Sequence, residues 1–174
     1  MLSVILLCGP PGAAKTARPE SIVRTLTPLV GAAVKGVVRD VVLAGPSDDQ
    51  LQVIAEHAGC TLVAEDLEAE RLKRGAAAAK GQALMIIESG HVPEPGFFEE
   101  IEDLLADGLP DQQKFLLRAA PESFFERLFP KLTPPGGVIV SRFLCERVGA
   151  KSLADLISAI KPPQTVQRRL RRIA

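Results

Sequence analysis

The chain contains 174 residues with a mass of 18.6 kDa, which is enough for one domain with a substantial hydrophobic core, or for a domain with a small appended subdomain. Its 21 Lys and Arg balance its 21 Asp and Glu, so no overall electrostatic field attracts nucleic acid or an anionic membrane. Seven Phe without any Trp or Tyr provide little aromatic surface on which the bases of single-stranded nucleic acid could stack. We therefore expect no nucleic-acid partner.

The sequence shows no targeting or membrane signal. Its longest N-terminal apolar run, residues 1–8, has no basic flank before it and is ended by a Gly-Pro pair, whereas a membrane-spanning helix needs about 20 apolar residues. We therefore expect a cytoplasmic protein. The three cysteines, Cys8, Cys60 and Cys145, are odd in number and far apart, which argues against a disulfide framework and against a zinc site.

The first 90 residues alternate between short apolar runs and helical patterns. The runs are rich in β-branched residues and apolar on both faces, which is typical of buried parallel strands. They cover residues 3–8, 41–44, 61–64 and 83–87, and helices are predicted between them over about 19–37, 47–58 and 66–79. This alternation predicts βαβ units with right-handed crossovers. The expected fold class is therefore α/β, a doubly wound, mainly parallel sheet with helices on both faces.

Two of these helices carry end signals. Pro19 followed by Glu20 indicates the start of the first helix, because proline suits the first turn and an acid suits the positive end of the helix dipole. Ser47, with Gln50 three residues later, has the form of a capping box for the second helix, which Gly59 would end. The inward face expected for the first helix is apolar, and it consists of Ile22, Val23, Leu26, Val30, Ala33, Val34 and Val37.

The pattern changes after residue 90. The expected elements are an amphipathic helix over 96–107, an edge strand over 114–118, a short helix over 122–129, a Pro/Gly-rich loop over 130–137 and a strand over 138–140. Two or three helices would finish the chain. The last of them would carry the basic sequence Arg168-Arg169-Leu170-Arg171-Arg172, and it would either pack on the domain or make weak peripheral contact with a membrane.

The segment from Gly9 to Thr16 is close to a phosphate-binding loop. Its sequence, Gly-Pro-Pro-Gly-Ala-Ala-Lys-Thr, departs from the Gly-x-x-x-x-Gly-Lys-Ser/Thr motif at Ala14. Such a loop opens directly into a helix, however, and Pro19 would then remove a backbone hydrogen bond inside that helix. Two interpretations stay open: the degenerate phosphate-binding loop of an NTPase, and an irregular loop after the first strand, which the position of Pro19 favours.

Small and polar residues follow three of the predicted strands. They are Gly9-Pro10 after the first strand, Gly45-Pro46-Ser47-Asp48-Asp49 after the second, and Glu88-Ser89-Gly90-His91 after the fourth. In an open α/β sheet a ligand binds beyond the carboxyl ends of the strands. We therefore expect these residues to line a common crevice.

Two segments of the sequence resemble the N-terminal half of family 2 glycosyltransferases of GT-A fold. One runs from Thr25 to Asp49 and the other from Gly75 to Phe97; in addition, residues 137–149 are similar to the family's acceptor-side segment. The resemblance implies a GT-A-like (Rossmann-like) fold with a nucleotide-sugar-binding half over 1–110 and a smaller acceptor-side half of the same domain over 111–174. It also implies binding of a nucleotide-diphosphate sugar and transfer of its glycosyl group to an acceptor hydroxyl.

The resemblance also implies roles for individual residues. The family's base-binding Asp corresponds to Ala44, whereas the rest of that motif survives as Ser47 and Asp49. The family's metal-binding Asp-x-Asp triplet reads Glu88-Ser89-Gly90, so Glu88, supplemented by His91, would place Mn²⁺ or Mg²⁺ on the diphosphate. Asp155 is the candidate catalytic base. The expected nucleotide-binding residues are Gly9, Pro10, Gly45, Ser47, Asp49 and Ser89.

Three of these motif positions differ from the family pattern. The base-binding carboxylate is absent, the Asp-x-Asp triplet keeps one acid, and Asp155 is the single acid at the place of the catalytic pair, where it also has the spacing of a capping box with Ser152. A second interpretation therefore stays open, in which the protein keeps the fold and binds the nucleotide sugar but has lost catalysis.

Overall fold

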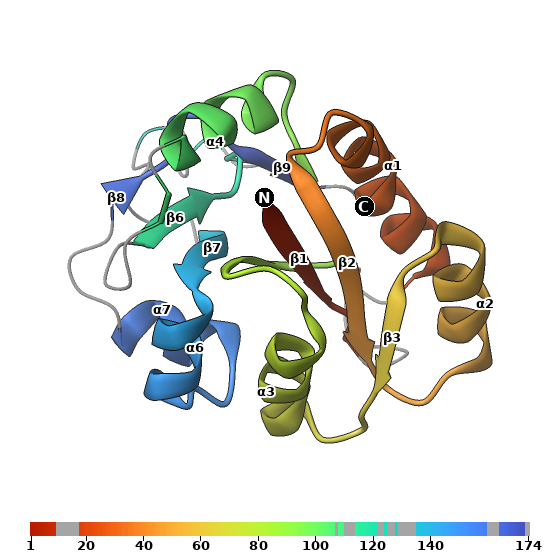
Figure 1. The fold of residues 1–174 in the computed structure, drawn as a ribbon. Helices are drawn as coiled ribbons and strands as arrows, with labels where there is room; N and C mark the ends of the chain where they lie inside the picture. The colour runs from red at the N-terminus through yellow and green to blue at the C-terminus, as the bar shows by residue number, and fades with distance from the viewer. Residues whose placement is uncertain are drawn as a thin grey trace.

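The computed structural model describes residues 1–9, 18–106, 108–109, 114–121, 124, 128, 135–159 and 164–172. Up to residue 90 strands and helices alternate in the predicted order (Figure 1). The strands are β1 (Leu2–Leu7), β2 (Val38–Gly45), β3 (Thr61–Ala64) and β4 (Ala83–Glu88). The helices are α1 (Pro19–Val34), α2 (Asp49–Ala58) and α3 (Glu68–Ala78). The predicted start of the first helix at Pro19 is confirmed.

The second half of the chain is a mixture of short strands and helices. In chain order its elements are β5 (His91–Pro93), α4 (Phe97–Leu105), β6 (Lys114–Arg118), β7 (Pro135–Ser141), α6 (Arg142–Val148), α7 (Leu153–Ala159), β8 (Gln164–Thr165) and β9 (Leu170–Arg172). The helix predicted over 122–129 lies mostly outside the described residues. No helix in the described ranges is long and apolar enough to cross a membrane.

Both halves contribute to one seven-stranded sheet with the strand order β3-β2-β1-β4-β7-β6-β8. Strands β3, β2, β1 and β4 are parallel, and β7 joins β4 in the antiparallel direction, with Ile87 opposite Gly137. A separate two-stranded sheet pairs β5 with β9. This arrangement confirms the predicted α/β class with a mainly parallel, doubly wound sheet.

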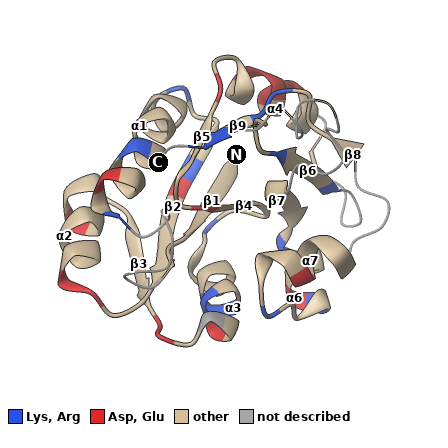
Figure 2. Cartoon of the chain, turned by 180° about the vertical axis from the view of Figure 1, so that it is seen from behind, with Lys and Arg blue, Asp and Glu red and all other residues tan. Residues whose placement is uncertain are grey.

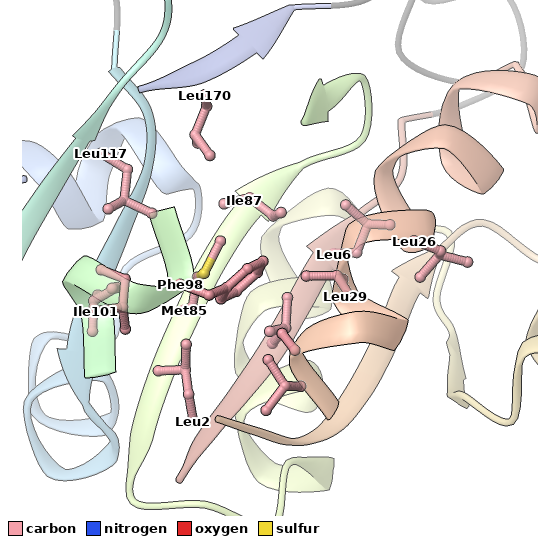
Figure 3. Packing of buried hydrophobic residues seen from close by; sticks show 14 of the residues in the cluster. Leu2, Leu6, Leu26, Leu29, Met85, Ile87, Phe98, Ile101, Leu117 and Leu170 are labelled. Atoms are coloured by element: carbon pink, nitrogen blue, oxygen red, sulfur yellow. The ribbon is translucent and has the colours of Figure 1, made fainter. Parts of the chain in front are cut away.

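Helices cover both faces of the sheet, so the protein has two hydrophobic cores. One core lies under α1, α2 and α4, and Figure 3 shows Leu26 and Leu29 of α1 with Phe98 and Ile101 of α4 on this face. The other lies under α3, α6 and α7 and includes Ile5 and Ile86. The central strands β1 and β4 therefore bury side chains in both directions, which explains why their sequences are continuously apolar.

The inward face of α1 differs from the prediction. Val23, Val30 and Val34, which were expected to face the core, are 50%, 61% and 85% exposed. The residues that α1 does bury are Ser21, Ile22, Thr25, Leu26, Leu29 and Ala32. Ser21 and Thr25 can be buried because each hydroxyl donates a hydrogen bond to a carbonyl of the preceding turn, over 2.8 Å. Their burial turns the valines outward.

Two further predictions for the second half are wrong. Strand β6 is not an edge strand, because β8 pairs with its outer side. The predicted Pro/Gly loop also ends early, because β7 begins at Pro135. Gly137 is needed there: a Cβ atom at this position would lie 2.6 Å from the carbonyl oxygen of Ile86, so only glycine lets β7 approach β4 this closely.

The basic tail forms a strand and not the predicted amphipathic helix. Its β9 residues pair with β5, and Leu170 is fully buried. The Glu100 carboxylate accepts hydrogen bonds from the backbone N–H groups of Gln167 and Arg168, over 2.7 and 2.8 Å. Figure 2 shows the basic β9 beside the acidic outer side of α4. Long-range pairing thus decides the structure of the tail against its helical spacing.

Candidate functional site

The connections between the parallel strands place a crevice at their carboxyl ends. From β1 the chain moves outward through β2 to β3 and then crosses back to β4 on the other side of β1. The strand order thus reverses between β1 and β4, and this place is called the switch point of the sheet. In doubly wound sheets ligands bind at the switch point. The residues after β1, β2 and β4 lie at this end of the sheet, as the sequence predicts.

The loop after β2 forms one side of the crevice. Asp48, and not Ser47 as predicted, caps α2, because its carboxylate accepts from the N–H of Gln50 over 2.7 Å. Ser47 is exposed and its N–H donates to the Asp66 carboxylate over 2.9 Å. Asp49 is exposed in the first turn of α2. The cleft beside this loop is lined by Cys8, Gly9, Pro19, Ile22, Pro46, Asp48, Gln50, Leu51 and Ile54.

Gly45 has a packing role at the end of β2. A Cβ atom on Gly45 would lie 2.7 Å from Cδ2 of Leu51 and 2.9 Å from Cβ of Cys8. Real Cβ atoms do not approach their neighbours so closely, because protein interiors are already close-packed. The glycine therefore allows the first turn of α2 to pack against the end of β1.

The turn after β4 is held tightly by its backbone. Glu88 is exposed at the end of β4, whereas Ser89 is fully buried and its N–H donates to the Leu7 carbonyl over 2.9 Å. Gly90 has a φ of +90°, in the left-handed region, and its N–H donates to the Thr25 hydroxyl over 3.1 Å. These bonds fix the turn against both β1 and α1.

His91, the other predicted metal ligand, is packed inside the protein. Its side chain is 7% exposed and Nδ1 lies 3.3 Å from the Glu88 carbonyl oxygen. Nε2 would be 3.2 Å from a Cβ atom on Gly136, so this nitrogen faces the start of β7. Both ring nitrogens therefore face protein atoms.

Arg71 of α3 is a residue that the sequence analysis missed. Its side chain is 5% exposed, and its guanidinium donates to three backbone carbonyls. The acceptors are Cys8 at 3.2 Å, Glu65 at 2.7 Å and Asp66 at 3.0 Å. The guanidinium thus joins the ends of β1 and β3 beside the crevice. Arginine in a helix is usually exposed, so the position of Arg71 carries no signal in the sequence for this role.

Burial and hydrogen bonding shift two pKa values near this guanidinium. Burial raises the pKa of the Cys8 thiol to about 12, with Arg71 acting in the opposite direction, so this thiol stays protonated and is a poor nucleophile. The pKa of Glu65 is lowered, first by the Leu67 N–H that its carboxylate accepts and then by the hydrogen bond from Arg74. Glu65 therefore stays ionised.

The remaining predicted site residues are Asp155 on α7 and those outside the described ranges. Asp155 is exposed in the first turn of α7, where its N–H donates to the Ser152 hydroxyl over 3.1 Å. Helix α7 belongs to the core with α3 and α6, whereas Leu170 of β9 belongs to the core on the other face. Pro10 and the rest of the segment through Thr16 lie outside the described residues. Helix α1 begins at Pro19, directly after an extended Arg18, which disfavours a phosphate-binding loop that opens into this helix.

The described residues do not supply the ligand set of a metal site. Among them no three His, Cys, Asp or Glu side chains form a group that could hold an ion. Glu88 is the one acid in the triplet after β4, and hard cations such as Mg²⁺ are held by several oxygen ligands. The described part of the crevice thus fits a bound divalent cation poorly.

No protein-family model and no curated protein sequence matches the chain. Solved structures do match its fold. Glucosyl-3-phosphoglycerate synthase from Mycobacterium tuberculosis, in complex with Mn²⁺, UDP and glucosyl-3-phosphoglycerate, superposes with a TM-score of 0.64 over 99% of this chain and 71% of that chain, at 21% identity. The same enzyme with Mn²⁺, UDP-glucose and phosphoglyceric acid gives 0.65 over 99% and 72%, at 19% identity.

A further solved structure, described as a mycobacterial protein, gives a TM-score of 0.62 over 98% of this chain and 65% of that chain, at 18% identity. The chain has a GT-A fold. The ends of β2, β1 and β4 lie side by side in this fold, and the start of β7 packs beside His91.

Proposed function

We propose that this chain is a glycosyltransferase-like protein that binds a nucleotide-diphosphate sugar in the crevice at the carboxyl ends of β1, β2 and β4. The observation that carries the proposal is the GT-A fold with its switch point between β1 and β4. Solved structures with this fold contain UDP or UDP-glucose. The exposed Ser47 and Asp49 at the start of α2 provide polar groups for the nucleoside.

The remaining nucleotide-binding residues act through the shape of the crevice. Gly9 follows β1 and Gly45 lets the start of α2 lie close to it; Pro10, which lies outside the described residues, completes the proposed set. Ser89 is fully buried, so it acts by fixing the turn that follows β4. In this proposal the nucleotide is held mainly by backbone and small residues, together with the polar start of α2.

Transfer of the sugar would proceed by attack of an acceptor hydroxyl oxygen on the anomeric carbon. The bond between that carbon and the diphosphate oxygen breaks, and the nucleoside diphosphate leaves with the electron pair. The hydroxyl proton passes to a general base. Asp155 is the proposed base, since its carboxylate is exposed at the start of α7.

A second candidate function is nucleotide-sugar binding without catalysis. Ala44 favours it, because its side chain is apolar and fully buried and therefore presents no polar group to a base. It packs beside Gly75 of α3, where a Cβ atom would lie 3.5 Å from it. The position of Asp155 in a helix-capping contact, where its N–H donates to the Ser152 hydroxyl, also favours this second function. Such a protein would sense or sequester the sugar nucleotide.

A ligand panel tests the proposal. Thermal unfolding would be followed with UDP, GDP, ADP, their sugars and ATP. A ligand at 100 times its dissociation constant stabilises the folded state by about 2.7 kcal/mol, so at least one nucleoside diphosphate should raise the melting temperature. Asp49→Asn should weaken that effect, and Asp103→Asn on the outer side of α4 should not. Stabilisation by ATP alone would contradict the proposal and favour a phosphate-binding loop.

Turnover separates the two candidate functions. Release of free sugar or of the nucleoside diphosphate from the nucleotide sugar that binds, abolished by Asp155→Asn, would identify an enzyme. Binding of the same nucleotide sugar with no release would identify a binding protein.

A further inference from the structure

We infer that a nucleoside diphosphate binds in this crevice without a divalent cation. The inference rests on the proposed function and concerns how the same site balances the charge of the diphosphate. Its basis is the placement of the acids at the carboxyl edge of the sheet.

The turn after β4 offers one exposed carboxylate and has no place for a second. Ser89 is fully buried and Gly90 has a φ of +90°, a conformation that residues with a side chain rarely adopt. An acid at either position would therefore be buried or strained. Glu88 is thus the single carboxylate that this turn can offer to a cation.

Three other acids at this edge accept hydrogen bonds from backbone N–H groups. The Asp48 carboxylate caps α2, the Asp66 carboxylate accepts from the Ser47 N–H, and the Glu65 carboxylate accepts from the Leu67 N–H. Each of these hydrogen bonds holds one carboxylate oxygen in place, and the three acids follow β2 and β3, whereas Glu88 ends β4 on the other side of β1. An ion beside Glu88 would therefore lie across β1 from all three acids.

Asp49 lies too far from Glu88 to share an ion with it. Asp49 follows β2, Glu88 ends β4, and β1 lies between these two strands. Neighbouring strands are about 4.8 Å apart, so the two strand ends are separated by roughly 10 Å. Ligand oxygens of one Mg²⁺ each lie about 2.1 Å from the ion. With both nitrogens of His91 facing protein atoms, neither His91 nor the acids that follow β2 and β3 would share a cation with Glu88.

The sign of the effect of Glu88 distinguishes the two modes of binding. With a cation, its carboxylate helps to hold the ion, and its removal weakens diphosphate binding. Without a cation, the exposed carboxylate repels the diphosphate, and its removal strengthens binding. Charge interactions between exposed groups are modest, so the expected gain is about two- to fivefold.

Calorimetric titration of the whole protein with UDP, GDP and ADP, each in excess EDTA and in excess MnCl₂, tests the inference. The expected result is that at least one diphosphate binds in EDTA and that MnCl₂ changes its dissociation constant by less than about threefold. Glu88→Gln should bind it more tightly in EDTA, whereas Glu88→Asp, and Glu102→Gln on α4, should match the unaltered protein.

Two results would overturn the inference, and they differ in what they say about function. Binding that requires MnCl₂ and is lost in Glu88→Gln would show a metal-dependent site and leave the proposed function standing. Absence of binding by every diphosphate in both buffers would overturn the inference and the proposed function together.

Discussion

The two ends of the central sheet differ in how their polar groups are used. At the amino end, the Asp40 carboxylate accepts from the Ser3 hydroxyl and from the Lys80 N–H, and the Ser3 oxygen accepts from the Gly81 N–H. The Arg142 guanidinium donates to the carbonyls of Ala79 and Gly81. These groups bond to one another, so the polar groups at this end cross-link the strands and the loop before β4.

The carboxyl end combines one internal cross-link with exposed polar groups. Arg71 ties the ends of β1 and β3 together, while Ser47, Asp49 and Glu88 are exposed around it. The amino end thus uses its polar groups in internal hydrogen bonds, whereas the carboxyl end combines a rigid base with exposed polar groups. Four predictions, taken from the largest expected effect to the smallest, test this difference.

Arg71→Met should have the largest effect. It would leave three carbonyls at the carboxyl end without the guanidinium that they now bond, and unsatisfied buried acceptors are costly, so the free energy of unfolding should fall by roughly 3 kcal/mol. Urea denaturation measures the change, and nucleotide binding should fall with it. Arg74→Met, three residues later in α3 and exposed, serves as the control. Equal stabilities of the two variants would contradict the cross-linking role.

Gly45→Ala should be the next most damaging. The added methyl group would overlap Leu51 and Cys8, and overpacking of this kind costs about 2 kcal/mol. Thermal unfolding measures the loss. Gly31→Ala is a matched control, because a Cβ atom there meets nothing within 4 Å; it should be neutral or stabilising. A stable Gly45→Ala protein would show that α2 moves easily relative to β1.

Asp40→Ala should separate stability from ligand binding. It removes the acceptor for Ser3 and Lys80 at the amino end, and the loss should be about 1 kcal/mol in urea denaturation. Nucleotide affinity should not change. Asp49→Ala should show the converse, a stability change below about 1 kcal/mol with weakened nucleotide binding. Weakened binding in Asp40→Ala would mean that the two ends are coupled.

Glu65→Gln should have its effect in acid. Because the folded-state pKa of Glu65 is lowered from 4.5, its contribution to stability is present above the unfolded value and is lost as the pH falls through the folded value. The variant should therefore lose less stability than the unaltered protein between about pH 6 and pH 3. Urea denaturation at several pH values measures the slope. Arg74→Met should reduce the slope in part, and an unchanged slope in Glu65→Gln would contradict the role of this carboxyl.

Local signals in the sequence predicted the first half of the chain well. Strand β3 begins and ends at Thr61 and Ala64 as expected, and Gly59 ends α2 with a left-handed φ of +66°. The carboxyl-end location of Ser47, Asp49 and Glu88 was also predictable, because it follows from the alternation of strands and helices. Such features depend on short-range chemistry that a sequence displays directly.

Errors arose where two local solutions were nearly equivalent. Ser47 and Asp48 are both good helix caps, and in the folded chain Asp48 caps α2 while the Ser47 N–H bonds to Asp66. Apolar residues surround much of α1, so its inward face was decided by Thr25, whose hydroxyl bonds to Ser21 and Gly90. The tail had helical spacing, but pairing with β5 and the Glu100 carboxylate placed it in a strand.

The sequence by itself determined the alternating strands and helices, the mainly parallel sheet and the edge of that sheet at which polar residues collect. Apolar periodicity and turn chemistry act over a few residues and are therefore visible in one dimension. Only the tertiary structure decided that Arg71 joins the ends of β1 and β3, that His91 turns inward and that Glu88 is exposed in the turn after β4. Those outcomes depend on contacts between segments far apart in the chain, whose energies no local pattern contains.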